Sequence, residues 1–187
     1  MAKENERFLG MLLDDDDNPI DGTEFIGWKS RSIAVVCLIV SRTSDNSFQF
    51  LLERRGPGCP DFVGCYCAVC GYLGWDETLR DAAVRETFEE TGLKIQKEDL
   101  KFIGINDNPS EDKRQNVSVR FLVEVEEKVL LKLIDEIDLR SDIRGGEKNE
   151  VDEITLVPYF FVKNNSSYFA FGHDKLIKYV VENYDKL

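Results

Sequence analysis

The sequence has no run of apolar residues long enough to cross a membrane. The longest, Ile33 to Val40, has eight residues, whereas a membrane-spanning helix needs roughly 18 to 20. The first residues, MAKENERF, also lack the basic segment and following apolar segment of a secretory signal. We therefore expect a cytoplasmic protein without a membrane partner.

Basic residues are scarce relative to acidic ones. The chain has 24 lysines and arginines against 36 aspartates and glutamates, a net charge of -12. Nonspecific nucleic-acid binding needs a basic face, so this balance argues against a nucleic-acid partner. If the substrate is a phosphate compound, bound cations must offset the repulsion between it and the protein.

The chain has one histidine, His173, and an odd number of cysteines, five. An odd number without an export signal argues against a disulfide framework. Four cysteines fall within twelve residues, with the spacing C-x5-C-x-C-x2-C (Cys59, Cys65, Cys67 and Cys70). Structural zinc sites favour CxxC pairs, and Cys67 and Cys70 form one. Free cysteines are also common core residues, so the sequence leaves both interpretations open.

The length of 187 residues favours one domain with an extra arm. We expect an N-terminal arm over 1–30 and a single domain over 31–187. The arm contains the acidic run Asp14 to Asp17 before Asn18-Pro19. Its spacing does not meet that of a calcium-binding EF-hand loop, so a solvated loop is expected.

Apolar periodicity predicts a mixed sheet with helices on both faces, an α/β (α+β) fold. The near-continuous apolar run at 32–40 predicts a strand buried on both faces, and 48–55 pairs back on it as a hairpin. Further strands are expected within 64–74, where a short strand runs into a glycine turn, and at 100–105, 116–125 and 154–158; helices are expected at 78–91, 129–137 and 174–184.

The expected helix at 78–91 carries three glutamates, Glu86, Glu89 and Glu90, on an arc of about 100°. A solvated acidic face is one interpretation. However, like charges three and four residues apart destabilise an isolated helix, whereas hard divalent cations take such oxygen ligands. Arg85 can reach Glu89 one turn along the helix and hold a carboxylate in a ligating position.

The stretch GYLGWDETLRDAAVRETFEETGL, Gly71 to Leu93, resembles the Nudix box. Eight positions match the family pattern: Gly71, Glu77, Arg85, Glu86, Glu89, Glu90, Gly92 and Leu93. Thr87 departs from the usual aliphatic residue, and Cys70 stands where the family often has a second glycine. The resemblance extends over residues 31–187 and implies an α/β/α sandwich with a metal-binding loop-helix-loop.

The resemblance implies hydrolysis of a nucleoside diphosphate linked to another moiety, with Mg²⁺ or Mn²⁺ as cofactor. By position, Glu86, Glu89 and Glu90 are implied metal ligands, joined by the Gly71 carbonyl. Arg85 would orient a ligating glutamate, and Glu77 would support it or bind another metal. The general base differs within the family, and candidates here are Glu147, Glu150 and Glu153; we select Glu150.

The substrate class is inferred from features outside the box. Arg54 and Arg55 end a strand where the family often places a basic residue at the substrate phosphates, and strand neighbours face opposite ways. Pro109, sixteen residues past the box, resembles the proline of many ADP-ribose pyrophosphatases, and Phe171 to Ile177 is similar to their entrance to the last helix. His173 is then structural rather than catalytic.

We therefore expect a small nucleotide partner, with ADP-ribose or a related nucleotide sugar first and a (deoxy)nucleoside triphosphate second; a homodimer stays open. A function of another class is a non-catalytic nucleotide-binding regulatory module, although such a module would be expected to lose box acids. Isomerase chemistry on an isoprenoid diphosphate would need a catalytic cysteine, for which Cys67 or Cys70 is available.

Overall fold

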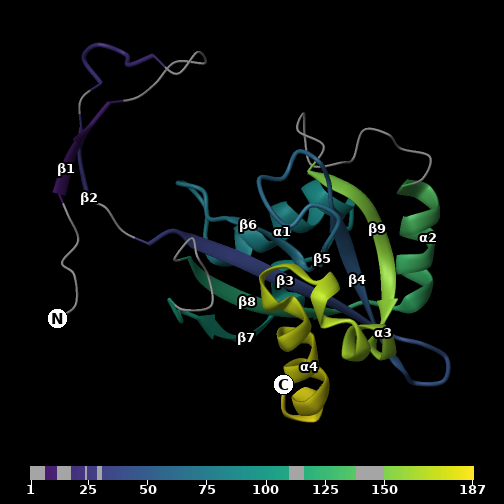
Figure 1. Ribbon diagram of the computed structural model, residues 1–187. Coiled ribbons are helices and arrows are strands. Elements are labelled where there is room, and N and C mark those ends of the chain that lie inside the picture. Colours follow the sequence, from purple (N-terminus) through teal and green to yellow (C-terminus); the bar gives the residue numbers. More distant parts are fainter. Residues whose placement is uncertain (1–6, 12–17, 24, 29–30, 110–115, 138–149) are drawn as a thin grey trace. The chain divides into compact units, whose positions relative to one another are not determined.

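The computed structural model describes residues 7–11, 18–23, 25–28, 31–109, 116–137 and 150–187. The chain forms two compact units, Met1–Ser32 and Ile33–Leu187. Within the first unit, strands β1 (Arg7–Gly10) and β2 (Phe25–Trp28) pair antiparallel (Figure 1). The acidic run at 14–17 lies outside the described residues.

The second unit is built around one mixed sheet. Its central strand β3 (Ile33–Arg42) is buried on both faces, and β4 (Phe48–Arg55) pairs back on it antiparallel. The sheet order is β5-β4-β3-β8-β7, and β3 and β8 (Val117–Glu124) run parallel. The remaining strands are β5 (Tyr66–Cys67), β6 (Val69–Tyr72), β7 (Lys101–Asn106) and β9 (Val151–Pro158); β6 pairs with β3 and β9 with β4.

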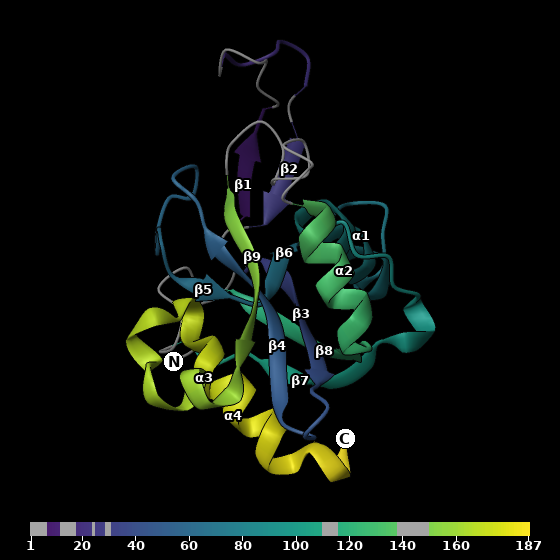
Figure 2. The same cartoon turned by 90° about the vertical axis from the view of Figure 1, so that its right-hand side faces the viewer.

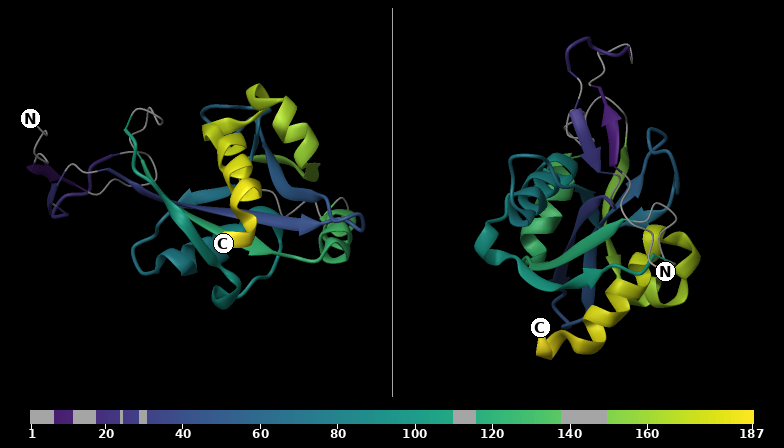
Figure 3. Two further views of the ribbon diagram at one scale, coloured as in Figure 1. Left: turned by 90° about the horizontal axis from the view of Figure 1, so that it is seen from below. Right: turned by 90° about the vertical axis from the view of Figure 1, so that its left-hand side faces the viewer.

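Helices cover both faces of this sheet, which confirms the predicted α/β/α sandwich (Figures 2 and 3). Alternate residues of β3 point to opposite faces. Val35, Cys37 and Ile39 pack with helices α1 (Leu79–Thr91) and α2 (Glu127–Ile137). Val36, Leu38 and Val40 pack with α3 (Tyr159–Asn164) and α4 (His173–Asn183). Among the described residues, no helix is long and apolar enough to span a bilayer.

Two details differ from the expected elements. Residues 65–72 form two short strands, β5 and β6, interrupted at Ala68, rather than one. The chain after Pro158 turns into helix α3, which apolar periodicity did not predict. Short 3-10 turns at Ser166–Tyr168 and Ala170–Gly172 then lead into α4.

Helix α1, which carries the three glutamates, is fixed at both ends. Thr78 caps its N-terminus and forms a capping box with Asp81, although Asp replaces the usual Glu or Gln. At the other end, Gly92 adopts the left-handed conformation at φ 72°, and its N–H bonds to the Phe88 carbonyl. These caps set where the helix starts and stops, and therefore where its acidic stripe lies.

His173 connects the start of α4 to the interruption between β5 and β6. Its side chain is buried, at 3% exposure, and its Nδ1 accepts a hydrogen bond of 3.0 Å from the Ala68 N–H. The acceptor nitrogen must be unprotonated, so the ring is neutral here. Burial, followed by the charges of Arg120 and Arg55, lowers the pKa of His173 to about 3. The histidine thus has a structural role in the described fold.

This pKa predicts an acid-sensitive stability. Below about pH 6.5, the pKa of histidine in an unfolded chain, His173 binds a proton in the unfolded protein but stays neutral in the folded one. The free energy of unfolding therefore decreases as pH falls. We expect the free energy of unfolding of the native protein to fall by about 1 kcal/mol more than that of His173→Gln between pH 6.5 and 5.5. Urea unfolding at both pH values measures the free energy of unfolding. Equal losses in the native protein and in His173→Gln would contradict the prediction.

Candidate active site

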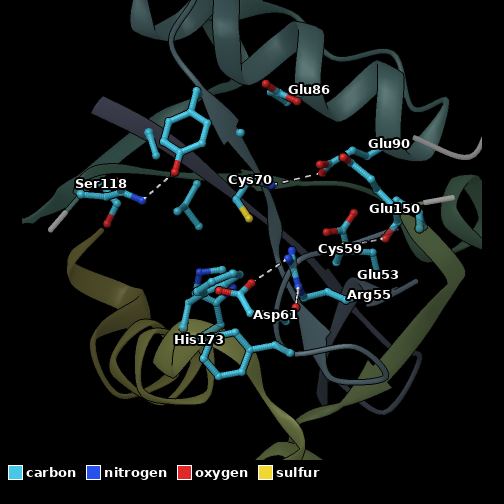
Figure 4. A pocket seen from close by; sticks show the side chains of 18 of the residues that line it. Glu53, Arg55, Cys59, Asp61, Cys70, Glu86, Glu90, Ser118, Glu150 and His173 are labelled. Atoms are coloured by element: carbon cyan, nitrogen blue, oxygen red, sulfur yellow. Dashed lines mark hydrogen bonds and ion pairs between the residues drawn. The ribbon is translucent and has the colours of Figure 1, made fainter. Parts of the chain in front are cut away.

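A cavity of about 720 Å³ opens between helix α1, strands β3, β4, β6 and β8 of the sheet, and the start of α4 (Figure 4). Its wall combines carboxylates, arginines, polar side chains and aromatic rings. Residues that line it include Glu53 and Arg55 from β4, Cys70, Gly71 and Tyr72 from β6, Arg85, Glu86 and Glu90 from α1, Ser118 and Arg120 from β8, and Glu150, Phe171 and His173. A cavity of this size is typical of a small-molecule site.

Arg85 organises the acidic stripe of α1. Its Nε and Nη2 contact the two oxygens of Glu77 at 3.0 and 2.7 Å, a bidentate pair. Its Nη1 contacts Glu86 Oε1 at 2.8 Å and Glu89 Oε2 at 2.9 Å, and Nη2 also donates to the Tyr72 carbonyl. These contacts, chiefly the one with Glu77, raise the pKa of Arg85 and lower that of Glu77. One guanidinium thereby fixes three carboxylates.

Gly71 faces Glu86 across the gap between β6 and α1. A side-chain carbon added at Gly71 would overlap the Glu86 carboxylate, so only glycine leaves this carboxylate its place beside the strand. Although Arg85 favours its charged form, burial raises the pKa of Glu86. The glycine of the box is therefore required by a close approach between strand and helix.

Glu90 lies deeper in the same wall. Its Oε2 accepts a hydrogen bond of 3.2 Å from the Cys70 N–H. Burial first, then the neighbouring charge of Glu53, raises the pKa of Glu90 well above its usual range. Glu89, by contrast, has a side chain that is 53% exposed and lies outside the cavity wall, where Arg85 connects it to the site.

The arrangement suits a hard divalent cation. Two partly desolvated carboxylates, Glu86 and Glu90, face one cavity, and an added positive charge would offset the cost of keeping both ionised. The donors within reach are carboxylate and carbonyl oxygens, the ligands that Mg²⁺ and Mn²⁺ prefer. Of the metal set implied by the box, Gly71, Glu86 and Glu90 line this cavity, whereas Glu89 lies outside its wall.

The two arginines at the end of β4 differ in position. Arg55 lines the cavity, where its Nη2 contacts Asp61 at 3.2 Å and its guanidinium lies over the Phe171 ring at 4.8 Å. Arg54 instead forms ion pairs with Asp152 at 2.7 Å and Glu153 at 3.1 Å on β9, and it is absent from the cavity wall. Of these two arginines, Arg55 is therefore the one that faces the cavity.

The candidates for the general base also differ in whether they line the cavity. Glu150 is exposed and lines the cavity, and its carbonyl accepts the Gly56 N–H at 2.7 Å. Glu153 is engaged by Arg54 and does not line the cavity. Glu147 lies outside the described residues. Pro109, on the loop after β7, is exposed and also absent from the cavity wall.

Sequence reasoning missed several residues of the cavity wall. Glu53 precedes Arg55 by two positions on β4, so strand periodicity alone would have placed both on one face. Asn106, Asn116, Ser118 and Arg120 contribute polar groups from β7 and the start of β8. These positions follow from the pairing of distant strands, which no local pattern in the sequence indicates.

The four clustered cysteines do not converge. Among the described residues, Cys67 and Cys70 lie together with Glu53, whereas Cys59 and Cys65 are not part of that group. The Cys59 thiol donates to the Glu150 carbonyl at 3.2 Å. A zinc site made of all four cysteines, which the spacing left open, is therefore not formed: the loop holding Cys59 and Cys65 does not fold back onto the other two.

The fold and the box residues define the class of protein: the chain belongs to the NUDIX domain family, which matches residues 30–176, and the resemblance is confirmed. Members of this Nudix hydrolase family generally use divalent metal ions. The chain is 30% identical over 135 residues to "ADP-ribose pyrophosphatase" of Methanocaldococcus jannaschii, which covers 72% of this chain and 65% of the relative. The match thus spans less than two thirds of that protein.

Solved structures share the fold at low identity. The NUDIX domain of Shewanella oneidensis NrtR, solved with ADP ribose, is 19% identical with a TM-score of 0.62, covering 83% of this chain and 89% of that one. A bifunctional NMN adenylyltransferase/ADP ribose pyrophosphatase from Francisella tularensis, solved with AMP and a manganese ion, is 17% identical with a TM-score of 0.60, covering 82% and 42%.

The role of Arg85 predicts a loss of metal binding in Arg85→Lys. Lysine keeps the charge but lacks the planar fork that holds three glutamates at once. We expect the dissociation constant for Mn²⁺, measured by calorimetry, to rise roughly 10- to 100-fold. Arg80→Lys is the matched control, since Arg80 lies on the same helix but donates to the Lys97 and Leu100 carbonyls. Equal effects of the two substitutions would refute the assigned role.

Proposed function

We propose that this protein is a Mg²⁺- or Mn²⁺-dependent hydrolase of nucleoside diphosphate-linked compounds, with ADP-ribose or a related nucleotide sugar as substrate. The observation that carries the proposal is the convergence of Gly71, Glu86 and Glu90 with Arg55 on one cavity of suitable size. The relative named for ADP-ribose supports the choice of substrate.

In this proposal Glu86, Glu89 and Glu90, with the Gly71 carbonyl, hold the metal, and Arg85 and Glu77 keep those glutamates in place. Bound divalent cations offset the charge of the diphosphate, orient the attacking water and stabilise the leaving oxygen. Arg55 contacts the substrate phosphates, which its place in the cavity wall and its delocalised charge favour. Arg54, held by Asp152 and Glu153, has no part in this step.

Glu150 is our choice for the general base because its side chain faces the cavity in a solvated position. It would accept a proton from the water as the water oxygen attacks a phosphorus of the diphosphate bridge. The bond from that phosphorus to the bridging oxygen then breaks, which from ADP-ribose gives AMP and ribose 5-phosphate. A general base typically contributes 10²- to 10⁴-fold in rate.

The aromatic part of the cavity favours a nucleotide over a simple diphosphate. Phe62 and Phe171 stand edge to face with ring centroids 5.0 Å apart, and both line the cavity. Phe62 keeps 47% of its surface exposed, so its ring has apolar area that a ligand can cover. A base stacked on these rings would bury that surface, with the diphosphate then reaching toward Arg55.

Two alternatives differ from this proposal in substrate or in turnover. A (deoxy)nucleoside triphosphate would use the same metal ligands and Arg55. Pro109, the residue that resembles the ADP-ribose type, does not line the cavity and therefore gives no argument against a triphosphate. A regulatory module would bind the nucleotide without turnover. Two observations argue against a regulatory module. All the box acids are present, and the net charge of -12 disfavours a DNA partner.

The test is product identification after incubation with Mg²⁺ and ADP-ribose, other nucleotide sugars, dinucleoside polyphosphates or nucleoside triphosphates. We expect AMP and ribose 5-phosphate from ADP-ribose, and a loss of at least about 100-fold in Glu90→Gln, since even groups that only support a metal ligand contribute 10- to 100-fold. Turnover of triphosphates alone would overturn the substrate. Nucleotide binding without any turnover would favour the regulatory module.

The two arginines of β4 provide a matched pair of variants. Arg55→Gln removes the cation from the cavity wall, so we expect KM for ADP-ribose to rise about tenfold or more, as expected for a lost charge-assisted contact of 1.5 to 3 kcal/mol. Arg54→Gln removes only exposed ion pairs to β9, and KM should stay within about twofold. Steady-state kinetics decides; a larger effect at Arg54 would be incompatible with Arg55 as the phosphate contact.

A further inference from the structure

A second group of metal-ligating side chains lies beside the acidic stripe of α1, and two of its three members line the cavity. It consists of Glu53 on β4, Cys67 on β5 and Cys70 on β6. One ligand atom from each residue lies within 4.8 Å of the other two. Among the described residues, this is the one group of three or more histidine, cysteine or acidic side chains at such distances.

The sheet itself brings the three residues together. Glu53 stands directly opposite Cys67 in the pairing of β4 with β5. After the interruption at Ala68, β6 crosses to pair with β3, and Cys70 then points to the same cavity as Glu53 (Figure 4). The ligand set is therefore supplied by rigid strands, which hold a site more accurately than loops do.

One oxygen of Glu53 has no hydrogen-bond donor among the described residues unless the neighbouring Glu90 is protonated. The side chain is 3% exposed; its Oε1 accepts the Cys67 thiol at 2.9 Å, but its Oε2 is buried without a hydrogen-bond partner among the described residues. Its neighbour is the Glu90 carboxylate, and the two carboxylates form a hydrogen bond only while one of them is protonated. A buried, unsatisfied carboxylate oxygen is costly, and a bound cation would remove that cost.

The chemistry of the ligands selects the cation. Two thiols and one carboxylate suit a thiophilic ion such as Zn²⁺, whereas Mg²⁺ and Mn²⁺ prefer oxygen ligands. Tetrahedral zinc with bonds of about 2.0 to 2.3 Å places its ligand atoms about 3.5 to 4 Å apart. The observed separations, within 4.8 Å, reach this by small side-chain rotations.

Charge and access also fit such an ion. The negative charges of a carboxylate and two thiolates are balanced by one divalent cation together with Arg55, whose guanidinium interacts with Cys67 and Cys70. Cys67 is fully buried, but Glu53 and half-buried Cys70 line the cavity and provide a route from solvent. Three protein ligands leave a fourth position toward the cavity, as in open zinc sites.

We propose that Glu53, Cys67 and Cys70 form a binding site for one thiophilic divalent cation such as Zn²⁺, distinct from the all-oxygen site on α1. On binding, the thiol protons pass to the buffer. The site adjoins Glu90, which bonds to the Cys70 backbone rather than to its thiol. The proposal does not depend on the substrate, because the cation binds in the absence of nucleotide.

The experiment uses Co²⁺ as a spectroscopic substitute for Zn²⁺, added to the full-length protein in a non-thiol reductant without nucleotide. We expect a sulfur-to-cobalt charge-transfer band and the visible bands of tetrahedral Co²⁺, saturating at one equivalent. Zn²⁺ should abolish these bands, and a large excess of Mg²⁺ should not. Co²⁺ bound only by the carboxylates of α1 gives neither the charge-transfer band nor the tetrahedral spectrum.

Cys70→Ala removes one ligand at a cavity-facing position, and Glu53→Gln keeps the shape of its side chain but removes the charge. Each should weaken Co²⁺ binding by at least about 100-fold, more than the 10- to 100-fold typical of groups behind the ligands. Cys65→Ala is the matched control, since Cys65 is outside the group, and it should bind as the native protein does.

Thermal unfolding of each variant verifies that it is folded before its Co²⁺ titration is interpreted. Three results would overturn the proposal: no charge-transfer band in the native protein, an unchanged band in Cys70→Ala and Glu53→Gln, or equal loss in Cys65→Ala. None of these results bears on hydrolysis, which is measured separately by product formation with Mg²⁺.

Discussion

The structure depends on one electrostatic constraint: several carboxylates share a partly desolvated space between β6 and α1. Repulsion and burial both oppose their charged forms, as the raised pKa values of Glu86 and Glu90 show. Arg85 offsets part of this cost by contacting Glu77, Glu86 and Glu89 at once. The remaining excess of negative charge is what makes the place suitable for a divalent cation.

The rest of the fold keeps that space in position. β3 is buried on both faces, so it fixes β6 and β8 as neighbours and supports helices on either side. Caps at both ends of α1 set the register of its acidic stripe against Gly71. His173 satisfies the Ala68 N–H where β5 and β6 separate, and Cys70 and Glu53 line the same cavity.

Local patterns in the sequence were sufficient for the strands 33–42 and 48–55 and for α1, because apolar periodicity and capping residues act over a few neighbours. Strand alternation predicted that Arg54 and Arg55 would separate, but which one faces the cavity depends on the acids of β9, far along the chain. The burial of Glu53 and the turn of the chain into α3 are likewise consequences of distant contacts. The box indicated Glu86 and Glu90, whereas their neighbours Asn106, Asn116 and Arg120 emerged only from the paired strands.

The central claim is that the carboxylates of α1 and the Gly71 carbonyl form a hard-cation site. An anomalous difference map of crystals soaked in Mn²⁺, recorded at the manganese edge, tests it most directly. The account predicts peaks within bonding distance of Glu86, Glu90 and the Gly71 oxygen. A well-ordered map with Arg85 in place and no peak near these residues, or manganese bound only elsewhere on the protein, would contradict it.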